Sequence, residues 1–118
     1  MFTDLHALGL GNDAGGEHVD PSQTDVLATT DAQPDGRYLC KVTIVAHSLD
    51  DSKALFEVQH RDSVDGEDPL ESVIVAVPAD DCSQFEVVFA LSADERITVV
   101  PYAAFIGTAI VSINWQRL

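Results

Sequence analysis

The chain has 118 residues, and its 20 aspartates and glutamates against 6 lysines and arginines give a net charge of −14. Proteins bind nucleic acids and anionic membranes through basic surfaces that neutralise phosphate groups, so this composition argues against both kinds of partner. In addition, no apolar run is long enough to span a membrane. A hydrophobic content of 46% argues against global disorder, and the length fits a single domain.

The first 23 residues differ from the rest of the chain and lack the basic flank and long apolar run of a signal peptide. Residues 1–10 carry apolar side chains at Phe2, Leu5, Leu8 and Leu10, and the first three have the i, i+3 spacing of a short helical turn. So short a helix is unstable alone in water, and the glycine-rich residues 11–16 break regular structure. We interpret residues 1–23 as an N-terminal arm on a flexible tether, with these four apolar residues as its predicted partner-binding residues.

From Thr24 onward, apolar and polar side chains alternate with the period of two that is typical of half-buried β-strands. The predicted strands are residues 25–30, 37–47, 54–61, 70–77, 84–91, 96–100 and 107–116. Turn signals separate them, and no helical periodicity of useful length occurs, which argues against a βαβ fold. We predict an all-β protein in which residues 24–118 form an antiparallel β-sandwich of the jelly-roll type.

The alternation also predicts which side chains face inward. The expected core residues are Tyr38, Val42, Ile44, Phe56, Val58, Phe85, Val87, Phe89 and Val111. Trp115 shares a strand face with apolar residues, so we place it in the core rather than, with Tyr102, on a sugar-stacking platform. Cys40 and Cys82 form no CxxC motif, and we expect both to be free thiols that behave as small hydrophobic residues.

Two segments carry residue types that suggest ligand binding. Residues 9–14 (GLGNDA) superficially resemble a phosphate-binding loop, but the strand before it, the helix after it and the lysine are missing. Residues 62–68 hold four carboxylates, whose oxygens suit calcium, but their spacing is not that of an EF-hand. We interpret the first segment as part of the tether and the second as a solvated acidic loop, and we predict no metal and no cofactor.

The histidines offer little catalytic chemistry. They are His6, His18, His47 and His60. Only His60, followed by Arg61 and Asp62, has neighbours suited to acid–base catalysis, and it falls on the apolar face of its strand, as expected for a packed or interface histidine. No serine lies in a GxSxG elbow, and no cysteines and histidines have zinc-ligand spacing. We therefore predict no catalytic residues and no enzymatic activity.

Short segments with a common strand texture are spread over most of the chain. They are LGLG at 8–11, ATT at 28–30, GRYLCKV at 36–42, FEVQHR at 56–61, ERITVVP at 95–101, IGTA at 106–109 and SINW at 112–115. In these segments the chain resembles the small jelly-roll decoration (cement) proteins on the heads of tailed bacteriophages. The resemblance includes no catalytic motif.

The resemblance implies a non-enzymatic virion protein on the capsid exterior, made in the host cytoplasm. Such a protein binds across neighbouring major capsid protein subunits, reinforces the shell and associates with itself as a homodimer or homotrimer. Two other classes remain open. A carbohydrate- or receptor-binding β-sandwich of a spike or adhesin would show exposed aromatic residues, and a cupin-like enzyme would need a His/Glu metal set that the sequence lacks.

Overall fold

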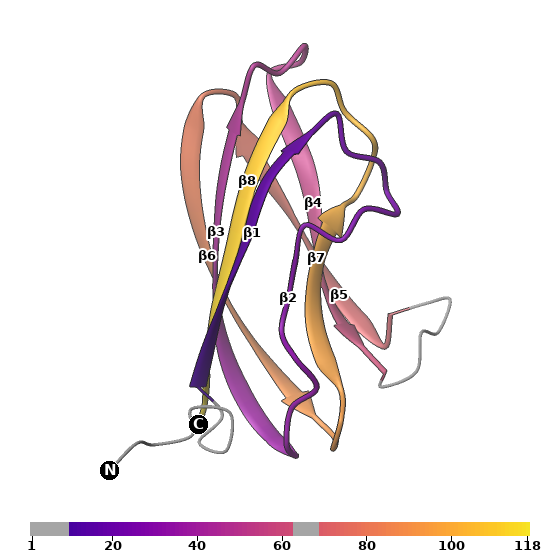
Figure 1. Cartoon of the computed structure of the whole chain (residues 1–118), viewed down its shortest axis with the longest axis vertical. Coiled ribbons are helices and arrows are strands. Elements are labelled where there is room, and N and C mark those ends of the chain that lie inside the picture. Colours follow the sequence, from indigo (N-terminus) through magenta and orange to yellow (C-terminus); the bar gives the residue numbers. More distant parts are fainter. Residues whose placement is uncertain (1–9, 63–68) are drawn as a thin grey trace.

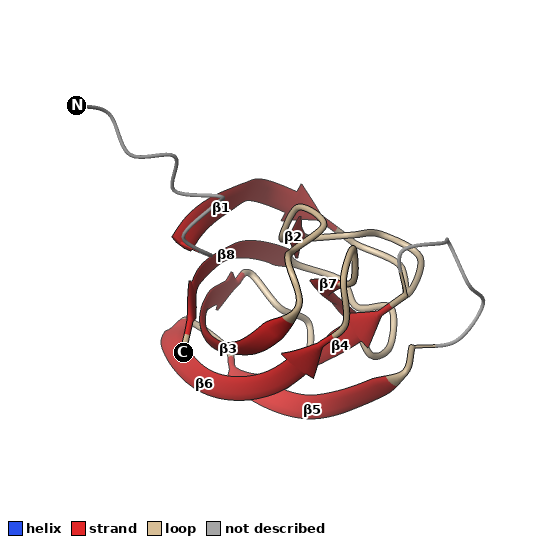
Figure 2. Ribbon diagram, turned by 90° about the horizontal axis from the view of Figure 1, so that it is seen from below, coloured by secondary structure: helices blue, strands red, loops and turns tan. Residues whose placement is uncertain are grey.

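The computed structural model describes residues 10–62 and 69–118, whose regular structure consists of β-strands (Figure 1). The strands are β1 (Leu10–Val19), β2 (Ala28–Thr29), β3 (Gly36–His47), β4 (Lys53–Arg61), β5 (Glu71–Pro78), β6 (Asp81–Leu91), β7 (Arg96–Pro101) and β8 (Thr108–Arg117). They form two four-stranded sheets, which lie as two layers when the molecule is seen along its length (Figure 2). The described part of the chain contains no helix that is long and apolar enough to cross a membrane.

The order of the strands defines a jelly roll. One sheet has the order β1-β8-β3-β6 and the other β2-β7-β4-β5, with every pair of neighbours antiparallel. The chain crosses between the sheets at every connection except the β4–β5 hairpin, so strands far apart in the sequence become neighbours. The predicted all-β jelly-roll sandwich is therefore confirmed.

The core lies between the two sheets and follows the predicted alternation. The predicted core residues that are buried are Tyr38, Val42, Ile44, Phe56, Val58, Phe89 and Val111. Phe85 and Val87 are only partly buried and pack against this cluster, because they lie on β6, an edge strand that is covered less completely. Trp115 is 8% exposed and belongs to the core, as predicted.

The N-terminal region differs from the prediction. Residues 10–19 form the edge strand β1, which pairs with β8 from Leu10 opposite Gln116 to Val19 opposite Thr108. The predicted flexible tether over residues 11–16 is therefore wrong, and this segment belongs to the sandwich. Of the predicted arm, residues 1–9 lie outside the described residues.

Two of the three glycines of β1, Gly11 and Gly15, allow close packing. A Cβ atom at Gly11 would clash with the indole ring of Trp115, and one at Gly15 would clash with the backbone oxygen of Leu27. Between these glycines, the Asp13 carboxylate accepts a hydrogen bond of 2.8 Å from the backbone N–H of Thr29. The glycine-rich segment 11–16, which we expected to be a tether, is therefore part of a strand that packs on the core.

Strand β2 is shorter than predicted, with Ala28–Thr29 in place of residues 25–30. The backbone N–H groups of Leu27 and Thr30 still donate hydrogen bonds of 2.8 Å each to carbonyl groups of β7. The segment therefore runs along β7 and closes this edge of its sheet.

The two phenylalanines of β6 provide a test of the core. We expect Phe89→Ala to lower the free energy of unfolding by about 3–5 kcal/mol, because Phe89 is 5% exposed and the truncation leaves a cavity. Phe85→Ala should cost clearly less, because Phe85 is only partly buried. Chemical denaturation followed by fluorescence measures both values, and an equal loss in the two variants would contradict the described packing.

Candidate functional site

The outer face of the β2-β7-β4-β5 sheet holds a groove of about 680 Å³, which we call the β4 groove. Gln59, Thr98 and Val100 form its floor, since they project from β4 and β7 on the side opposite the core. Residues of the 23–26 and 29–32 segments line it as well. Arg61 and Arg96 lie directly opposite each other on the two strands and also line the groove.

A buried polar network holds the floor of the β4 groove. The Gln59 side chain donates to a Glu57 carboxylate oxygen at 2.5 Å, and its own oxygen accepts hydrogen bonds from Arg61 at 2.9 Å and from the Thr98 hydroxyl at 3.3 Å. Gln59 and Thr98 are 7% and 2% exposed, so their partners fix the orientation of the amide. The groove presents hydroxyl, amide and guanidinium groups and the Asp31 carboxylate, which suit polar recognition.

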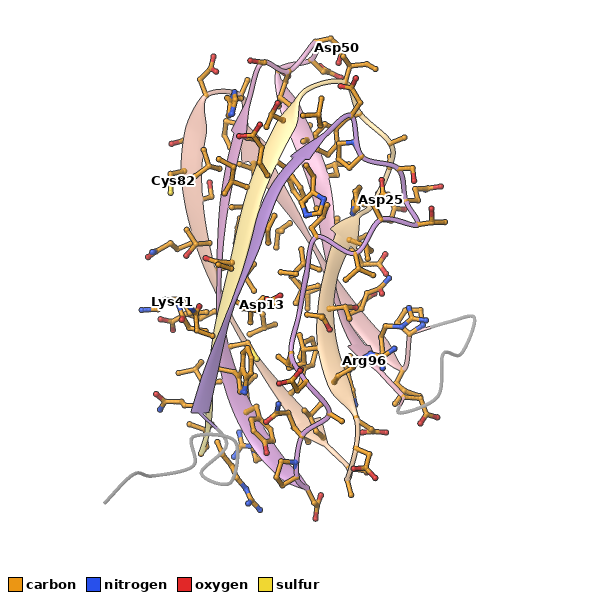
Figure 3. The ribbon with its side chains drawn as sticks, viewed as in Figure 1. Asp13, Asp25, Lys41, Asp50, Cys82 and Arg96 are labelled. Carbon is orange, nitrogen blue, oxygen red and sulfur yellow. The ribbon has the colours of Figure 1, made fainter. Side chains whose placement is uncertain are left out.

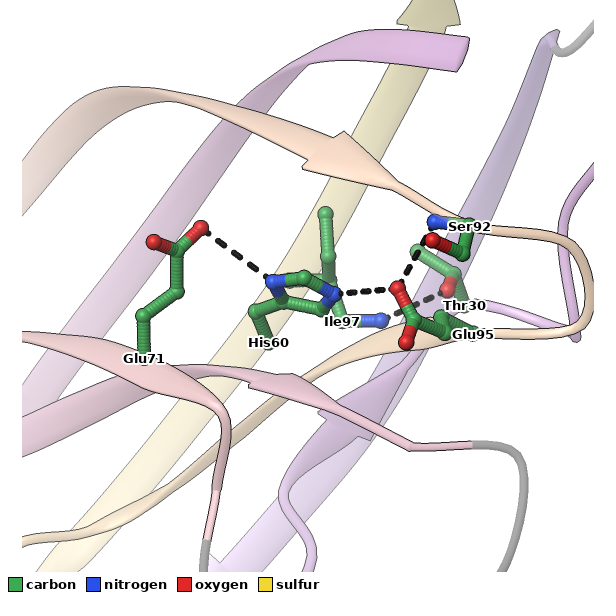
Figure 4. Close-up of polar contacts among 6 residues, drawn as sticks. All are labelled: Thr30, His60, Glu71, Ser92, Glu95 and Ile97. Carbon is green, nitrogen blue, oxygen red and sulfur yellow. Dashed lines mark hydrogen bonds and ion pairs between the residues drawn. The ribbon is translucent and has the colours of Figure 1, made fainter. Parts of the chain in front are cut away.

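His60, the histidine that we predicted to be packed, lies inside the sandwich between two carboxylates (Figure 4). Its Nδ1 is 3.2 Å from Glu71 and its Nε2 is 2.8 Å from Glu95, while its ring lies 5.8 Å from that of Phe89. Glu95 also accepts a hydrogen bond of 2.7 Å from the backbone N–H of Ser92. His60 is 6% exposed and joins β4 to β5 and to the turn before β7, so the prediction of a packed histidine is confirmed.

This arrangement links β4 to β5 and to the turn before β7 through the imidazole ring. The two carboxylates approach opposite nitrogens of the ring and so do not converge on one point. Within residues 10–62 and 69–118, no group of three histidine, cysteine or acidic side chains is placed to hold a metal ion. The acidic segment considered for calcium cannot be placed, since residues 63–68 lie outside the described residues.

The outer face of the β1-β8-β3-β6 sheet, which we call the β3 face, carries a second hollow of about 570 Å³. The side chains of Leu39, Lys41, Glu86, Asn114 and Gln116 contribute to its lining. Lys41 and Cys82 project from this side of the molecule, whereas Asp50 lies at one end (Figure 3). The hollow combines amide groups with one cation and one anion.

Within residues 10–62 and 69–118, the aromatic side chains do not gather into an exposed platform. Trp115 packs in the core, and Tyr102 is 43% exposed, the one aromatic side chain classed as exposed among the residues that the structure describes. Of the predicted partner-binding residues, Leu10 begins β1, whereas Phe2, Leu5 and Leu8 lie outside the described residues. The sequence did not predict the β4 groove or the hollow on the β3 face, because each combines residues from strands that are distant in the chain.

The cysteines differ in environment. Both thiols are free, as expected, with Cys40 buried in the core and Cys82 exposed on β6, so the expectation of a packed hydrophobic cysteine is wrong for Cys82. Cys82 pairs with Val45, which places it on the solvent side of an edge strand. Burial raises the pKa of the Cys40 thiol to about 12, so this thiol stays protonated near neutral pH.

No protein-family model and no curated protein sequence matches the chain, but solved structures share its fold. The vertex protein P5 of PRD1 aligns with a TM-score of 0.60 and 11% identity over 94% of this chain and 97% of that one. The carbohydrate-binding module CBM6cm-2 of Cellvibrio mixtus lichenase 5A, in complex with cellotriose, aligns with a TM-score of 0.52 and 11% identity over 93% and 98% of the two chains. The CBM22-1–GH10 fragment of Clostridium thermocellum xylanase 10B aligns with a TM-score of 0.62 and 15% identity, covering 92% of this chain but only 24% of that chain.

These similarities place the chain in an architecture that serves both viral coats and carbohydrate-binding modules. At 11–15% identity they establish the fold alone. Function must therefore be argued from the surfaces of this chain.

The carboxylates around His60 provide a test of the buried link. We expect Glu95→Ala to destabilise the protein by about 1–3 kcal/mol, because it leaves a buried ring nitrogen and the Ser92 N–H without their acceptor. Glu71→Ala is the matched control and should cost less than about 1 kcal/mol, because that side chain is 53% exposed against 14% for Glu95. Urea unfolding measures both, and a larger loss for Glu71→Ala would contradict the geometry.

Thiol labelling tests the cysteine environments. At pH 8, we expect a thiol reagent to modify Cys82 in the folded protein and to reach Cys40 only after unfolding, because Cys40 is buried and protonated. Mass spectrometry of Cys82→Ser should accordingly show no label until denaturant is added. Rapid labelling of Cys40 in the folded chain would contradict its burial.

Proposed function

We propose that the chain is a structural protein of a virion, a capsid decoration protein that binds across neighbouring major capsid protein subunits and stabilises the head shell. Its partners are then the capsid protein and further copies of itself, with no nucleic acid, membrane or enzymatic reaction involved. The protein would lie on the capsid exterior after synthesis in the host cytoplasm. The observation that carries this proposal is the way in which β1 anchors the N-terminal residues.

Strand β1 provides a fixed starting point for the apolar N-terminal residues. Its pairing with β8 begins at Leu10, and Gly11 and Gly15 pack closely against Trp115 and the Leu27 backbone, so the chain N-terminal to Leu10 leaves from an ordered sheet edge. An anchor of this kind reduces the conformational entropy that an apolar segment loses when it docks. We infer that Phe2, Leu5 and Leu8, with Leu10 at the boundary, dock against a capsid subunit or a neighbouring copy.

The alternative is a carbohydrate-binding module, and the polar β4 groove favours it, as does the shared fold of CBM6cm-2 with its cellotriose. Sugar rings, however, are usually held by stacking on exposed aromatic side chains in addition to hydrogen bonds. Here Trp115 is packed in the core, and the lining of the β4 groove includes no aromatic residue among those that the structure describes. The PRD1 vertex protein P5 supports the virion assignment, since it has this fold over nearly its whole length.

The test is co-sedimentation with empty shells assembled from the major capsid protein encoded in the same genome. We expect the full chain to pellet with the shells and Leu5→Asp/Leu8→Asp to bind about 100-fold more weakly or worse, because each of the two buried leucines contributes about 1.5–3 kcal/mol. Ile74→Asp, at an outward-facing position of β5 that is 50% exposed, is the control substitution and should leave binding unchanged. The fold of each variant is checked by circular dichroism.

Two results would overturn the proposal. One is a chain that fails to bind the shells at any concentration while binding cellotriose or xylohexaose in a calorimetric titration. The other is a Leu5→Asp/Leu8→Asp variant that decorates shells at full occupancy, which would show that the N-terminal residues are not the docking element.

A further inference from the structure

The loop between β7 and β8, residues 102–106 with the sequence YAAFI, presents apolar side chains to solvent. Tyr102 and Ile106 are 43% and 55% exposed, and both alanines of the loop are exposed as well. Loops on a protein surface are usually polar, and a run of exposed apolar residues is unfavourable unless a partner covers it. This loop is therefore a candidate contact surface.

The loop is anchored to the sandwich at both ends. The ring of Phe105 packs edge-to-face on that of Phe56 in the core, with the two centroids 5.6 Å apart. The backbone N–H of Tyr102 donates a hydrogen bond of 2.9 Å to a carbonyl of β4, and the carbonyl of Ile106 accepts one of 3.2 Å from the N–H of Asp50. The exposed side chains thus belong to an ordered loop, which reduces the entropy that is lost when a partner binds.

A hollow of about 480 Å³, which we call the loop hollow, lies against this loop. Its apolar lining comes from Ala54, Leu55 and residues 103–106. Its charged lining consists of Asp20, Asp50, Asp51 and Lys53, all of which are exposed. An apolar floor with exposed carboxylates beside it suits a partner that inserts an apolar side chain and places cations next to it.

The charge of the loop hollow distinguishes it from the other two hollows. Three aspartates and one lysine line it. The β4 groove instead has two arginines and one aspartate in its described lining, and the hollow on the β3 face has one lysine and one glutamate. Of these three surfaces, the loop hollow is therefore the one that favours a basic partner.

The loop hollow and the start of β1 lie at opposite ends of the sandwich. Strand β1 runs from Leu10 at the lower end of Figure 1 to Val19 at the upper end, which is also the end that carries Asp50 (Figure 3). The backbone N–H of Asp20 donates a hydrogen bond of 2.7 Å to the carbonyl of Gly107, so the end of β1 lies beside the loop. A strand of ten residues is about 30 Å long, which separates the loop hollow from the point where the N-terminal residues leave the sheet.

We propose that the loop hollow is a second capsid-binding surface, which takes up an apolar side chain flanked by lysine or arginine. This side chain belongs to a capsid subunit other than the one that the N-terminal residues contact. The inference rests on the proposed capsid function and adds the contact through which one copy spans two subunits. Attachment at two ends about 30 Å apart is bivalent, so each contact strengthens the other.

The test compares Ile106→Ser with Ile74→Ser in co-sedimentation with empty shells of the major capsid protein. Both variants replace an exposed isoleucine by serine, but Ile74 lies on β5 and does not line the loop hollow. We expect Ile106→Ser to bind about tenfold more weakly, because one apolar side chain is no longer buried, and Ile74→Ser to bind as the wild type does.

Thermal melting of the shells tests the bridge separately from affinity. At saturating concentration, we expect the wild type and Ile74→Ser to raise the melting temperature of the shells. Ile106→Ser should not raise it, because a copy that is held at one end joins no two subunits. Circular dichroism of each free variant establishes that it is folded.

Charge variants test the chemistry of the partner. Asp50→Asn/Asp51→Asn and the control Glu17→Gln/Glu86→Gln each remove two exposed carboxylates, and the control positions lie on strands outside the loop hollow. We expect the first pair to weaken shell binding about fivefold at about 50 mM NaCl, and the difference from the control to narrow at about 500 mM, because salt screens ion pairs.

Three results would overturn the inference. The first is that Ile106→Ser equals Ile74→Ser both in shell binding and in the melting temperature of the shells; if Leu5→Asp/Leu8→Asp still loses binding, the proposed capsid function stands. The second is equal binding of the two charge variants at low salt, which contradicts a basic partner. The third is a wild-type chain that binds no shells, which overturns the capsid function as well.

Discussion

The pairing of β3 on both of its edges is the constraint on which the rest of the structure depends. This strand is hydrogen-bonded to β6 from Gly36 to Ala46 and to β8 from Tyr38 to His47. Because side chains alternate along a strand, this one register sends every second side chain from Tyr38 to Ala46 into the core and sends the residues between them outward. A slip by one residue would exchange the two sets, so the core and the β3 face are fixed together.

The sequence predicts those parts of the fold in which the residue pattern follows from burial on one face of a strand. The period-two alternation identifies every strand from β3 to β8, since burial on one face alone produces it. It fails for β1, where Gly11 and Gly15 are signs of close contact with Trp115 and the Leu27 backbone, and these contacts exist only after folding. It also overestimates the burial of Phe85, because a sequence does not show which strand will lie at the edge of a sheet.

The sites were less predictable than the fold. The inward position of His60 follows from alternation, but its carboxylate partners come from β5 and from the turn before β7, 11 and 35 residues away. The β4 groove is similarly formed by β4, β7 and the segment around β2, so no local sequence motif predicts it. The hollow on the β3 face likewise combines side chains from four strands, β1, β8, β3 and β6. In each case the decisive partners come from long-range pairing that a single sequence does not encode locally.

The described residues place polar side chains in grooves on the outer faces of both sheets, and we propose that the protein acts through contacts with a capsid shell. The most direct measurement of that claim is a cryo-electron microscopy reconstruction of capsid shells incubated with the full chain. We expect density for the sandwich on the shell exterior, with the segment N-terminal to Leu10 in contact with capsid subunits and continuous with β1. Shells that carry no additional density at saturating protein concentration would contradict it.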